Sequence, residues 1–417
     1  MFATSPGERF QAFPLRSHLT SFDHEERAVI ELSAVLEAPV ERAPVANLAD
    51  CLLLCSGGVE KEAVRLLQAG AARVILAGEA HNAHAAGAEV VAWARDLGLP
   101  VHLQLVSPAT GPTLRCWLQA QRALVRLREA RLGVLGGSAD WLVASLPDPA
   151  TLTQRFGVSL AAVSWPELAE AIGDDFPFRK AVEAERWTSL PRDAEVSSAD
   201  MRRALGFTAA LGAFARQRGL QAVTLNCFEA IQRLGVTGCL ALADLDENGV
   251  PSACEGDIVT ALTKLIIHEA TGCVSWMANL VSASGTTVRL AHCTAPPSLS
   301  RSSRLRRHLE TGQGVAFAGR FPADQPVTLL RLSRDLKEAV LLRGRTVDEE
   351  PSASRCRTQV RVELDHPLPA VLGNHHALVF GDQWLPLFAL LGLAGVRVLG
   401  CQAEPLVWPE PCDELLV

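Results

Sequence analysis

The stretch ACEGDIVTALTKLIIHEATGCVSWMAN (253–279) decides the fold that we expect for this chain. From Asp257 onward its apolar residues recur at steps of three and four, which predicts an amphipathic helix. Asp257 is suited to cap the start of this helix, and Gly272 is suited to end it. The apolar run GCLALAD (238–244) predicts a strand before the helix, and CVSWMAN (273–279) predicts a strand after it. We therefore expect a strand–helix–strand unit with parallel strands.

This unit places polar side chains where a ligand would bind. Ligands of parallel sheets bind beyond the carboxyl ends of the strands, and Glu255 and Asn279 would both lie there. The positive end of the helix dipole favours ionised carboxylates at Glu255 and Asp257. A metal ion or a sugar would fit such a place. The alternative is that Glu255 only caps or decorates the start of the helix.

The composition is that of an ordinary protein with several domains. The chain has 417 residues, of which 48% are hydrophobic and 20% charged, and its formal net charge is −7. This balance gives no general attraction for nucleic acid. The first residues do not resemble a secretory signal, and no apolar run is long enough to cross a membrane. We therefore expect a cytoplasmic protein with no nucleic-acid or membrane partner.

The eleven cysteines are expected to be reduced and to pack in the core. They form no CxxC pair, and several lie inside apolar runs, as Cys51 and Cys55 do. This distribution fits buried thiols better than disulfides or a zinc site.

The order of predicted elements divides the chain into three parts. Strands alternate with helices from residue 49 to residue 106, and again from residue 132 onward, which is typical of parallel sheets covered by helices. From residue 286 short alternating strands follow one another, which indicates a barrel or sandwich. The expected fold class is therefore α/β: two Rossmann-like α/β domains with parallel sheets, then a C-terminal, mostly antiparallel β-barrel domain. The expected bounds are 1–130, 131–280 and 281–417.

Two further segments carry weaker signals. The turn SGGVE (56–60) would cradle an anion at a helix start, but a tight turn that needs glycine is the more common reason for such a sequence. The segment RSSRLRRHLETG (301–312) concentrates arginine, which would bind an acidic group or form the solvated face of a helix. We expect the tight turn and the helix face.

Three histidines are candidates for a metal site, because imidazole and carboxylate together suit Mn²⁺, Zn²⁺ or Fe²⁺. His292 lies at the end of a predicted strand, and His375 follows a Gly-Asn turn. Taken singly, each is also explained by a structural role. His268 lies among apolar residues of the predicted helix, so we interpret it as a core histidine.

The motifs together resemble those of the L-fucose isomerase and L-arabinose isomerase superfamily, most closely its short fucose-isomerase-like members. In that family a Glu-x-Asp opens a helix that runs into His-x-x-Thr-Gly, and a metal-binding Asp follows in the next strand. The matching residues here are Glu255-Gly256-Asp257, the HEATG segment (268–272) and Asn279. The histidine of the family's Asn-His pair falls on His375. By a looser match, a further histidine falls on His292.

The resemblance implies a metal-dependent aldose–ketose isomerase that acts on a monosaccharide. The cofactor would be Mn²⁺ or another divalent cation, and the protein would be a homo-oligomer. The implied metal ligands are Glu255, Asn279, His375 and His292. Glu255 would move a proton between C1 and C2 of the sugar through an enediolate, and Asp257 would orient its neighbours, shuttle protons or only cap the helix.

The chain departs from the family at Asn279, where an amide replaces the expected carboxylate. An amide oxygen can bind a hard cation, but it carries no charge and accepts no proton. We therefore expect weaker metal binding, or binding that depends more on the two histidines. The alternative function is a non-catalytic sugar-binding or regulatory relative that has lost turnover. A nucleotide-binding oxidoreductase is disfavoured because no GxGxxG motif opens a helix.

Overall fold

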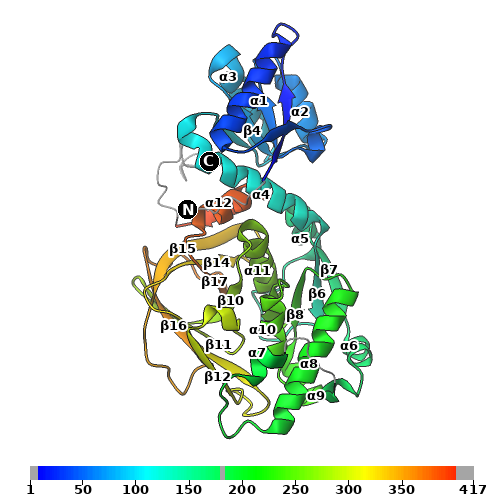
Figure 1. Ribbon diagram of the computed structural model, residues 1–417, viewed down its shortest axis with the longest axis vertical. Coiled ribbons are helices and arrows are strands. Elements are labelled where there is room, and N and C mark those ends of the chain that lie inside the picture. The colour runs from blue at the N-terminus through cyan, green and yellow to red at the C-terminus, as the bar shows by residue number, and fades with distance from the viewer. Residues whose placement is uncertain (1–7, 179–183, 401–417) are drawn as a thin grey trace.

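The computed structural model describes residues 8–178 and 184–400 and confirms the expected fold class. Two parallel sheets are followed by an antiparallel barrel. In Figure 1 the first sheet and its helices form the upper body, and the second sheet and the barrel lie side by side below it. Residues 1–7, at the start of the first expected domain, lie outside the described residues. Residues 401–417, at the end of the third expected domain, also lie outside them.

The upper body is a five-stranded parallel sheet in the order β2-β1-β3-β4-β5. Its strands are β1 (Phe10–Leu15), β2 (Val40–Arg42), β3 (Cys51–Leu54), β4 (Val74–Ala77) and β5 (His102–Leu105). Its helices are α1 (Phe22–Leu36), α2 (Glu60–Gln68) and α3 (Ala83–Asp96). The glycine turn before α2 is a tight turn in which Gly58 has a φ of 80°. The Gly58 N–H donates to Glu60 Oε1, so the turn binds a carboxylate of its own helix.

Helix α4 (Gly111–Glu129) leads into the second parallel sheet, whose order is β7-β6-β8-β9. The strands are β6 (Arg131–Leu135), β7 (Ser159–Val163), β8 (Ala222–Leu225) and β9 (Ser252–Cys254). The helices of this part are α5 (Pro149–Phe156), α6 (Trp165–Ile172), α7 (Ala184–Thr188), α8 (Ser198–Gln217), α9 (Cys227–Leu234), α10 (Cys239–Glu247) and α11 (Ile258–Thr271).

The C-terminal part is a closed six-stranded antiparallel barrel in the order β14-β17-β10-β11-β16-β15, closed by pairing of β15 with β14. Its strands are β10 (Ser275–Ser284), β11 (Thr287–His292), β14 (Pro326–Leu332), β15 (Glu338–Val347), β16 (Thr358–Leu364) and β17 (His375–Phe380). The hairpin of β12 (Ser302–Arg306) and β13 (Ala316–Arg320) is separate. Helix α12 (Trp384–Leu393) and β18 (Arg397–Leu399), which pairs with β15, end the described chain.

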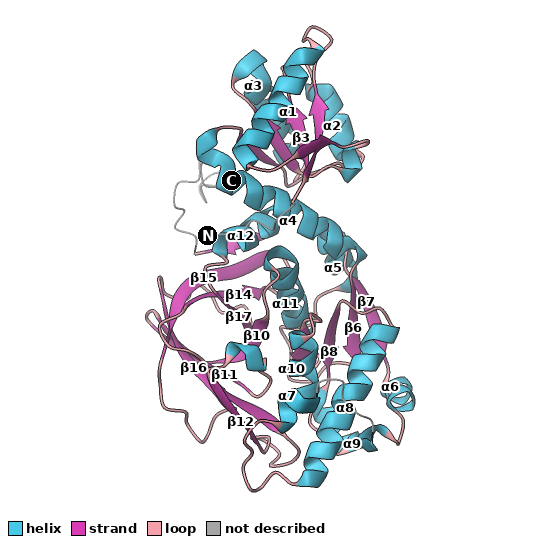
Figure 2. Cartoon of the chain, in the orientation of Figure 1, coloured by secondary structure: helices cyan, strands magenta, loops and turns pink. Residues whose placement is uncertain are grey.

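Helix α11 lies between the second sheet and the barrel, as Figure 2 shows. The expected helix is confirmed: Asp257 caps it by accepting from the Thr260 N–H at 2.7 Å, and Gly272 ends it with a φ of 67°. All residues from 258 to 267 are buried. A helix that is covered on every side belongs to the core, so α11 fixes the sheet relative to the barrel.

The two strands expected beside this helix need correction. Residues 239–247 form helix α10, and the short strand β9 precedes α11 instead. The segment CLALADLDE has leucine and alanine but no β-branched residue, so its composition favours a helix. Residues 275–284 do form a strand, but β10 pairs antiparallel with β11 and β17 in the barrel. The turn at Gly285, with a φ of 57°, folds the chain back into this hairpin.

The expectation of a helix face in the arginine-rich segment was wrong, because residues 302–306 form strand β12. Leu305 is buried, whereas Arg304 and Arg306 point to the other side, as alternation along a strand requires. Both guanidinium groups lie 2.9 Å from the carboxylate of Asp193. The segment therefore binds an acidic group of the same chain.

A buried ion pair joins α10, α11 and β9. Lys264 Nζ donates to Asp246 Oδ2 and to the Ser252 carbonyl oxygen, each at 2.6 Å. Both charged side chains are almost inaccessible, at 1% and 2% exposure. Removing one partner of such a pair leaves a buried charge without compensation, which is more costly than replacing both partners.

We expect the substitution Lys264→Met to lower the free energy of unfolding by about 3–5 kcal/mol, because Asp246 would lose its counter-ion. Chemical denaturation of the purified variant measures this loss. The double variant Lys264→Met/Asp246→Leu is the control and should be closer to wild type. A single variant as stable as wild type would contradict a structural role for the pair.

Candidate functional site

Glu255 lies in the tight loop between β9 and α11, at the carboxyl end of the second parallel sheet. Its φ is 64°, a left-handed conformation that is uncommon for a residue other than glycine. The following Gly256 has a φ of 71°, and a Cβ atom there would lie 2.2 Å from the Gly137 carbonyl oxygen. Only glycine therefore fits this close approach.

Hydrogen bonds from the loop after β6 hold Glu255 in this conformation. The Ala139 N–H donates to the Glu255 carbonyl oxygen at 2.9 Å, and the Ser138 hydroxyl donates to the Gly256 carbonyl oxygen at 2.6 Å. The Trp141 indole Nε1–H donates to Glu255 Oε2 at 2.7 Å. These contacts fix both the backbone and one carboxylate oxygen, and the other oxygen, Oε1, faces His375.

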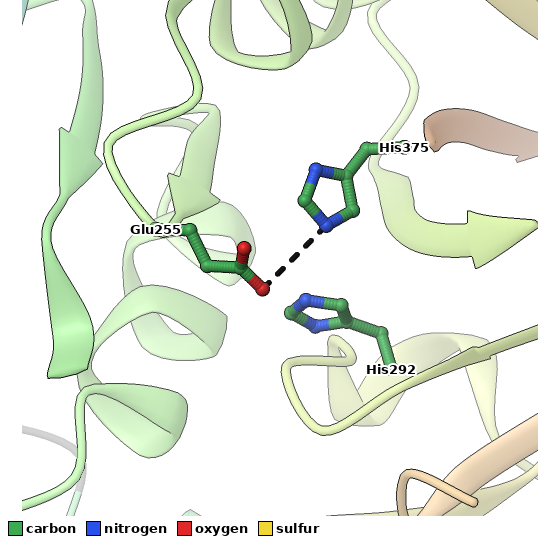
Figure 3. A group of neighbouring side chains, drawn as sticks. All are labelled: Glu255, His292 and His375. Atoms are coloured by element: carbon green, nitrogen blue, oxygen red, sulfur yellow. Dashed lines mark ion pairs between the residues drawn. The ribbon is translucent and has the colours of Figure 1, made fainter. Parts of the chain in front are cut away.

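Three sequence-predicted residues converge at this loop. Figure 3 shows Glu255, His292 and His375 pointing toward one another from three separate elements. Glu255 Oε1 lies 3.6 Å from His375 Nε2, and one ligand atom from each of the three residues lies within 4.8 Å of the others. Both histidines are buried, and the Glu255 side chain is 13% exposed.

Asp257 positions His375 in addition to capping α11. Its Oδ2 lies 2.8 Å from His375 Nδ1 and 3.5 Å from Arg331 Nη1. The Asp257 carboxylate accepts the Nδ1–H of the His375 ring and so fixes a proton on Nδ1. The other ring nitrogen, Nε2, is turned to Glu255. His375 Nε2 is buried and has no hydrogen-bond partner.

The charges around His375 favour its protonated form. Burial by itself would lower the pKa of His375, but the Asp257 and Glu255 carboxylates outweigh burial and raise this pKa to about 9. Burial would likewise raise the pKa of Asp257, and His375 and Arg331 lower it to about 2 instead. Burial would also raise the pKa of Glu255, but His375, His292 and Trp141 together outweigh burial and lower this pKa. At neutral pH an imidazolium thus lies between two carboxylates.

His292 is neutral and differs from His375 in its hydrogen bonding. Burial and the nearby His375 lower the pKa of His292 to about 3. The Thr294 N–H donates to Nδ1 at 3.2 Å, which leaves Nε2 on the side of the ring that faces Glu255 (Figure 3). A cation bound at this Nε2 would require the proton of the ring on Nδ1, so the Thr294 hydrogen bond would have to break.

Asn279 lies beside this group. It pairs with His375 across β10 and β17, and its Oδ1 accepts a hydrogen bond from Asn374 Nδ2 at 2.7 Å. Asn279, Glu255 and His292 line one cavity of about 20 Å³. A cavity of this size holds about one water molecule or one ion. His268, by contrast, lies half-buried in the last turn of α11 and is not a fully buried core residue.

The residues present fit the divalent cation that the family resemblance implies. The donors are two imidazoles and one carboxylate, a set that suits Mn²⁺, Fe²⁺ or Zn²⁺, and two of the three donors, Glu255 and His292, line the ion-sized cavity. Nε2 of His375 has no hydrogen-bond partner and faces Glu255. The Nδ1–H of His375 is held by the Asp257 carboxylate, as is usual for metal-binding histidines.

Sequence reasoning missed Trp141 and Arg331. Trp141 follows the carboxyl end of β6, where ligand-binding residues of parallel sheets gather, and this position was a usable signal. Arg331 is a charged residue inside the apolar strand PVTLLRL, and it is fully buried. Its guanidinium also donates to the Ala144 carbonyl oxygen and to Ser145. A charge in a buried strand indicates a buried partner, here Asp257.

This chain is similar in sequence to sulfoquinovose isomerases. It is 25% identical to that of Alkalicoccus urumqiensis over 281 residues, which are 62% of this chain and 61% of the relative. It is 25% identical to that of Clostridium sp. (strain MSTE9) over 307 residues, 66% of each chain, and 24% identical to that of Priestia megaterium over 64% of this chain and 63% of the relative. The match thus spans less than two thirds of the curated relatives. No protein-family model matches the chain.

The raised pKa of His375 predicts how stability depends on pH when no metal is bound. A raised pKa stabilises the folded state below the unfolded value of 6.5, and this contribution is lost as pH rises to about 9. The free energy of unfolding in chelator should therefore fall between these pH values, by up to about 1.4 kcal/mol per pH unit.

Chemical denaturation at pH 6 to 9.5 measures this slope. The matched variant is Asp257→Asn, because asparagine caps helices as well as aspartate but carries no charge. The variant should flatten the slope. Stability that increases over this pH range, or a slope that Asp257→Asn leaves unchanged, would contradict the protonated state of His375.

Proposed function

We propose that this chain is an aldose–ketose sugar isomerase and that Glu255, His292 and His375 bind Mn²⁺ or another divalent cation, with Asn279 at the edge of the site. The observation that carries the proposal is the approach of these three side chains from three elements, with one ligand atom of each within 4.8 Å of the others. Glu255, His292 and Asn279 also line a cavity of ion size. The similarity to sulfoquinovose isomerases supports the reaction type independently.

Glu255 is the group that we assign to proton transfer. Its carboxylate is ionised, and Trp141 holds one oxygen while the other faces the site. It would take a proton from one of C1 and C2 of the open-chain sugar and return it to the other, through an enediolate. The hydroxyl proton would pass in the same direction between the two oxygens, O1 and O2. The cation, when bound, would polarise the sugar carbonyl and stabilise the negative charge that develops on its oxygen. Asp257 would keep the Nδ1–H of His375 in place throughout.

The carboxylate missing at Asn279 has no direct substitute among the acids expected from the sequence. Asp257 is fully buried and occupied by His375, Thr260 and Arg331. Among the described residues, the carboxylates that line the cavity are Glu255 and Glu310. Glu310 is bound by His308 and by the Cys356 thiol, so we assign both proton-transfer steps at carbon to Glu255. One carboxylate suffices when the proton moves between neighbouring carbons on one face.

Trp141 supports a sugar as the substrate. Its side chain is 56% exposed although it hydrogen-bonds Glu255, and its ring packs edge to face on Phe228 with the centroids 5.1 Å apart. An exposed indole offers an apolar face for the C–H groups of a sugar ring and lies directly beside the proton-transfer group. We propose that the sugar binds on the Trp141 side of Glu255.

We also propose which sugars the protein converts and that it forms a homo-oligomer. The relatives' name makes sulfoquinovose the first sugar to test, followed by L-fucose and L-arabinose, which the motif resemblance suggests. A cytoplasmic homo-oligomer with no nucleic-acid or membrane partner remains our expectation. Among the described residues, no helix combines the length and the apolar character needed to cross a bilayer.

A non-catalytic sugar-binding relative is the second candidate function. The specific observation in its favour is Asn279, whose amide oxygen is already bound by Asn374 and contributes no charge to the site. Stabilisation by a sugar without turnover, in protein loaded with Mn²⁺, would favour this candidate over the isomerase.

We expect Glu255→Gln to reduce kcat by about 10²–10⁴-fold on whichever of these sugars the wild type converts, because glutamine accepts no proton. Formation of ketose from aldose in Mn²⁺-loaded protein measures the change. Glu247→Gln, at the end of α10 and outside the site, is the matched control and should retain full activity. The isomerase proposal would be rejected if the wild type converted none of the sugars, or if Glu255→Gln were fully active.

Binding of Mn²⁺ should release about one proton per ion at pH 7. His375 holds a proton until about pH 9 and must lose it to coordinate, whereas Glu255 is already ionised and His292 is already neutral. Affinity should therefore rise up to about tenfold per pH unit between pH 6 and 8. Calorimetric titration in two buffers of different ionisation enthalpy counts the protons. Binding without proton release would show that His375 is not a ligand.

A further inference from the structure

A second group of metal-ligating side chains shares no ligand residue with the first, although both groups contribute to the lining of one cavity. Cys293, His308 and Glu310 each place one ligand atom within 4.8 Å of the others. Cys293 directly follows β11, whereas His308 and Glu310 follow β12. The cysteine and the histidine are 3% and 6% exposed, and the Glu310 side chain is 43% exposed. The group is thus buried on one side and open on the other.

The orientation of His308 is fixed by its surroundings. Its Nδ1 lies 3.1 Å from Thr311 Oγ1, and its Nε2 lies 3.1 Å from Glu310 Oε2. The Phe228 ring packs edge to face on the imidazole, with the centroids 5.8 Å apart. The hydrogen bond at Nδ1 fixes the orientation of the ring, as is usual for metal-binding histidines. The other nitrogen, Nε2, is thereby directed to Glu310.

Cys356, in the loop before β16, supplies a fourth donor. Its thiol donates to Glu310 Oε1 at 3.4 Å, and both Cys356 and Cys293 are free cysteines. Both thiols, His308 and Glu310 line the cavity of about 20 Å³ that Glu255, Asn279 and His292 also line. The expectation that the cysteines only pack in the core is therefore too simple for these two, because each lies next to an ionisable group.

We propose that Cys293, His308, Glu310 and Cys356 form a second cation site, which binds Zn²⁺. Two sulfur atoms, one nitrogen and one oxygen are a ligand set that borderline-soft Zn²⁺ accepts in tetrahedral geometry. Bonds of about 2.0–2.3 Å place neighbouring ligand atoms about 3.3–3.8 Å apart. His308 Nε2 lies 3.1 Å from Glu310 Oε2, and Cys356 Sγ lies 3.4 Å from Glu310 Oε1, which are close to these values. A small rotation of the carboxylate would direct one of its oxygens to the ion.

The two sites differ in the cation that they prefer. The group of Glu255, His292 and His375 contains no sulfur, whereas half of the donors of the second group are thiols. Thiolate selects Zn²⁺ over Mn²⁺. Cys293 follows His292 in the chain, so a zinc ion would be anchored next to a ligand of the first site and would hold the β11 end and the 308–310 loop together.

Titration of metal-free, reduced protein with Co²⁺ tests this proposal, because cobalt bound to thiolate gives an intense charge-transfer band in the near ultraviolet. We expect the wild type to develop this band with one equivalent of Co²⁺ and to lose it when Zn²⁺ is added. Cys356→Ser and Glu310→Gln, whose side chains are partly exposed, should weaken the Co²⁺ affinity at least about tenfold. The double variant Cys293→Ser/Cys356→Ser should show no band.

Two control variants separate this site from the rest of the chain. Cys273→Ser, in a free cysteine outside the cluster, and Glu255→Gln, in the first site, should both retain the band. Circular dichroism checks that each variant is folded; if Cys293→Ser does not fold, Cys356→Ser and Glu310→Gln decide. The proposal is overturned if the wild type shows no thiolate band, or if the band persists unchanged in folded Cys356→Ser and Glu310→Gln.

Discussion

The buried carboxylate of Asp257 is the interaction on which the candidate site depends. It accepts the Thr260 N–H at the start of α11, bonds His375 of β17, and pairs with Arg331 of β14. One side chain thus joins the central helix to two strands of the barrel. Because Glu255 lies only two residues before this cap, the separation between its carboxylate and His375 is set by the same contacts.

The surroundings make this geometry stiff. Helix α11 is buried along most of its length, and the Glu255 loop is pressed against Gly137 with no room for a side chain at Gly256. Sites placed on such elements keep their geometry better than sites on free loops. Without a metal ion, the His375 imidazolium between Glu255 and Asp257 provides the positive charge that the two carboxylates require. A divalent cation would replace that proton with a larger charge at nearly the same place.

The sequence predicted the features that depend on local pattern. The spacing of apolar residues, the cap at Asp257 and the stop at Gly272 predicted α11. A strand end indicated His292, and the Gly-Asn turn indicated His375. Patterns that depend on distant partners were misleading. The run at 239–247 suits a buried strand and a buried helix alike, and its lack of β-branched residues was the signal to weigh. Strand β10 was assigned to the wrong sheet, since only pairing with β17, almost a hundred residues later, places it in the barrel. Trp141 and Arg331 reach the site through such long-range contacts, although the strand end before Trp141 and the charge inside the apolar strand at Arg331 were local signals.

The most direct measurement is an anomalous-scattering map of crystals soaked in Mn²⁺. We expect one strong peak within coordination distance of Glu255 Oε1 and the Nε2 atoms of His292 and His375, with the Thr294 hydrogen bond to His292 broken. A map with manganese bound elsewhere on the protein and no peak between these three side chains would contradict it.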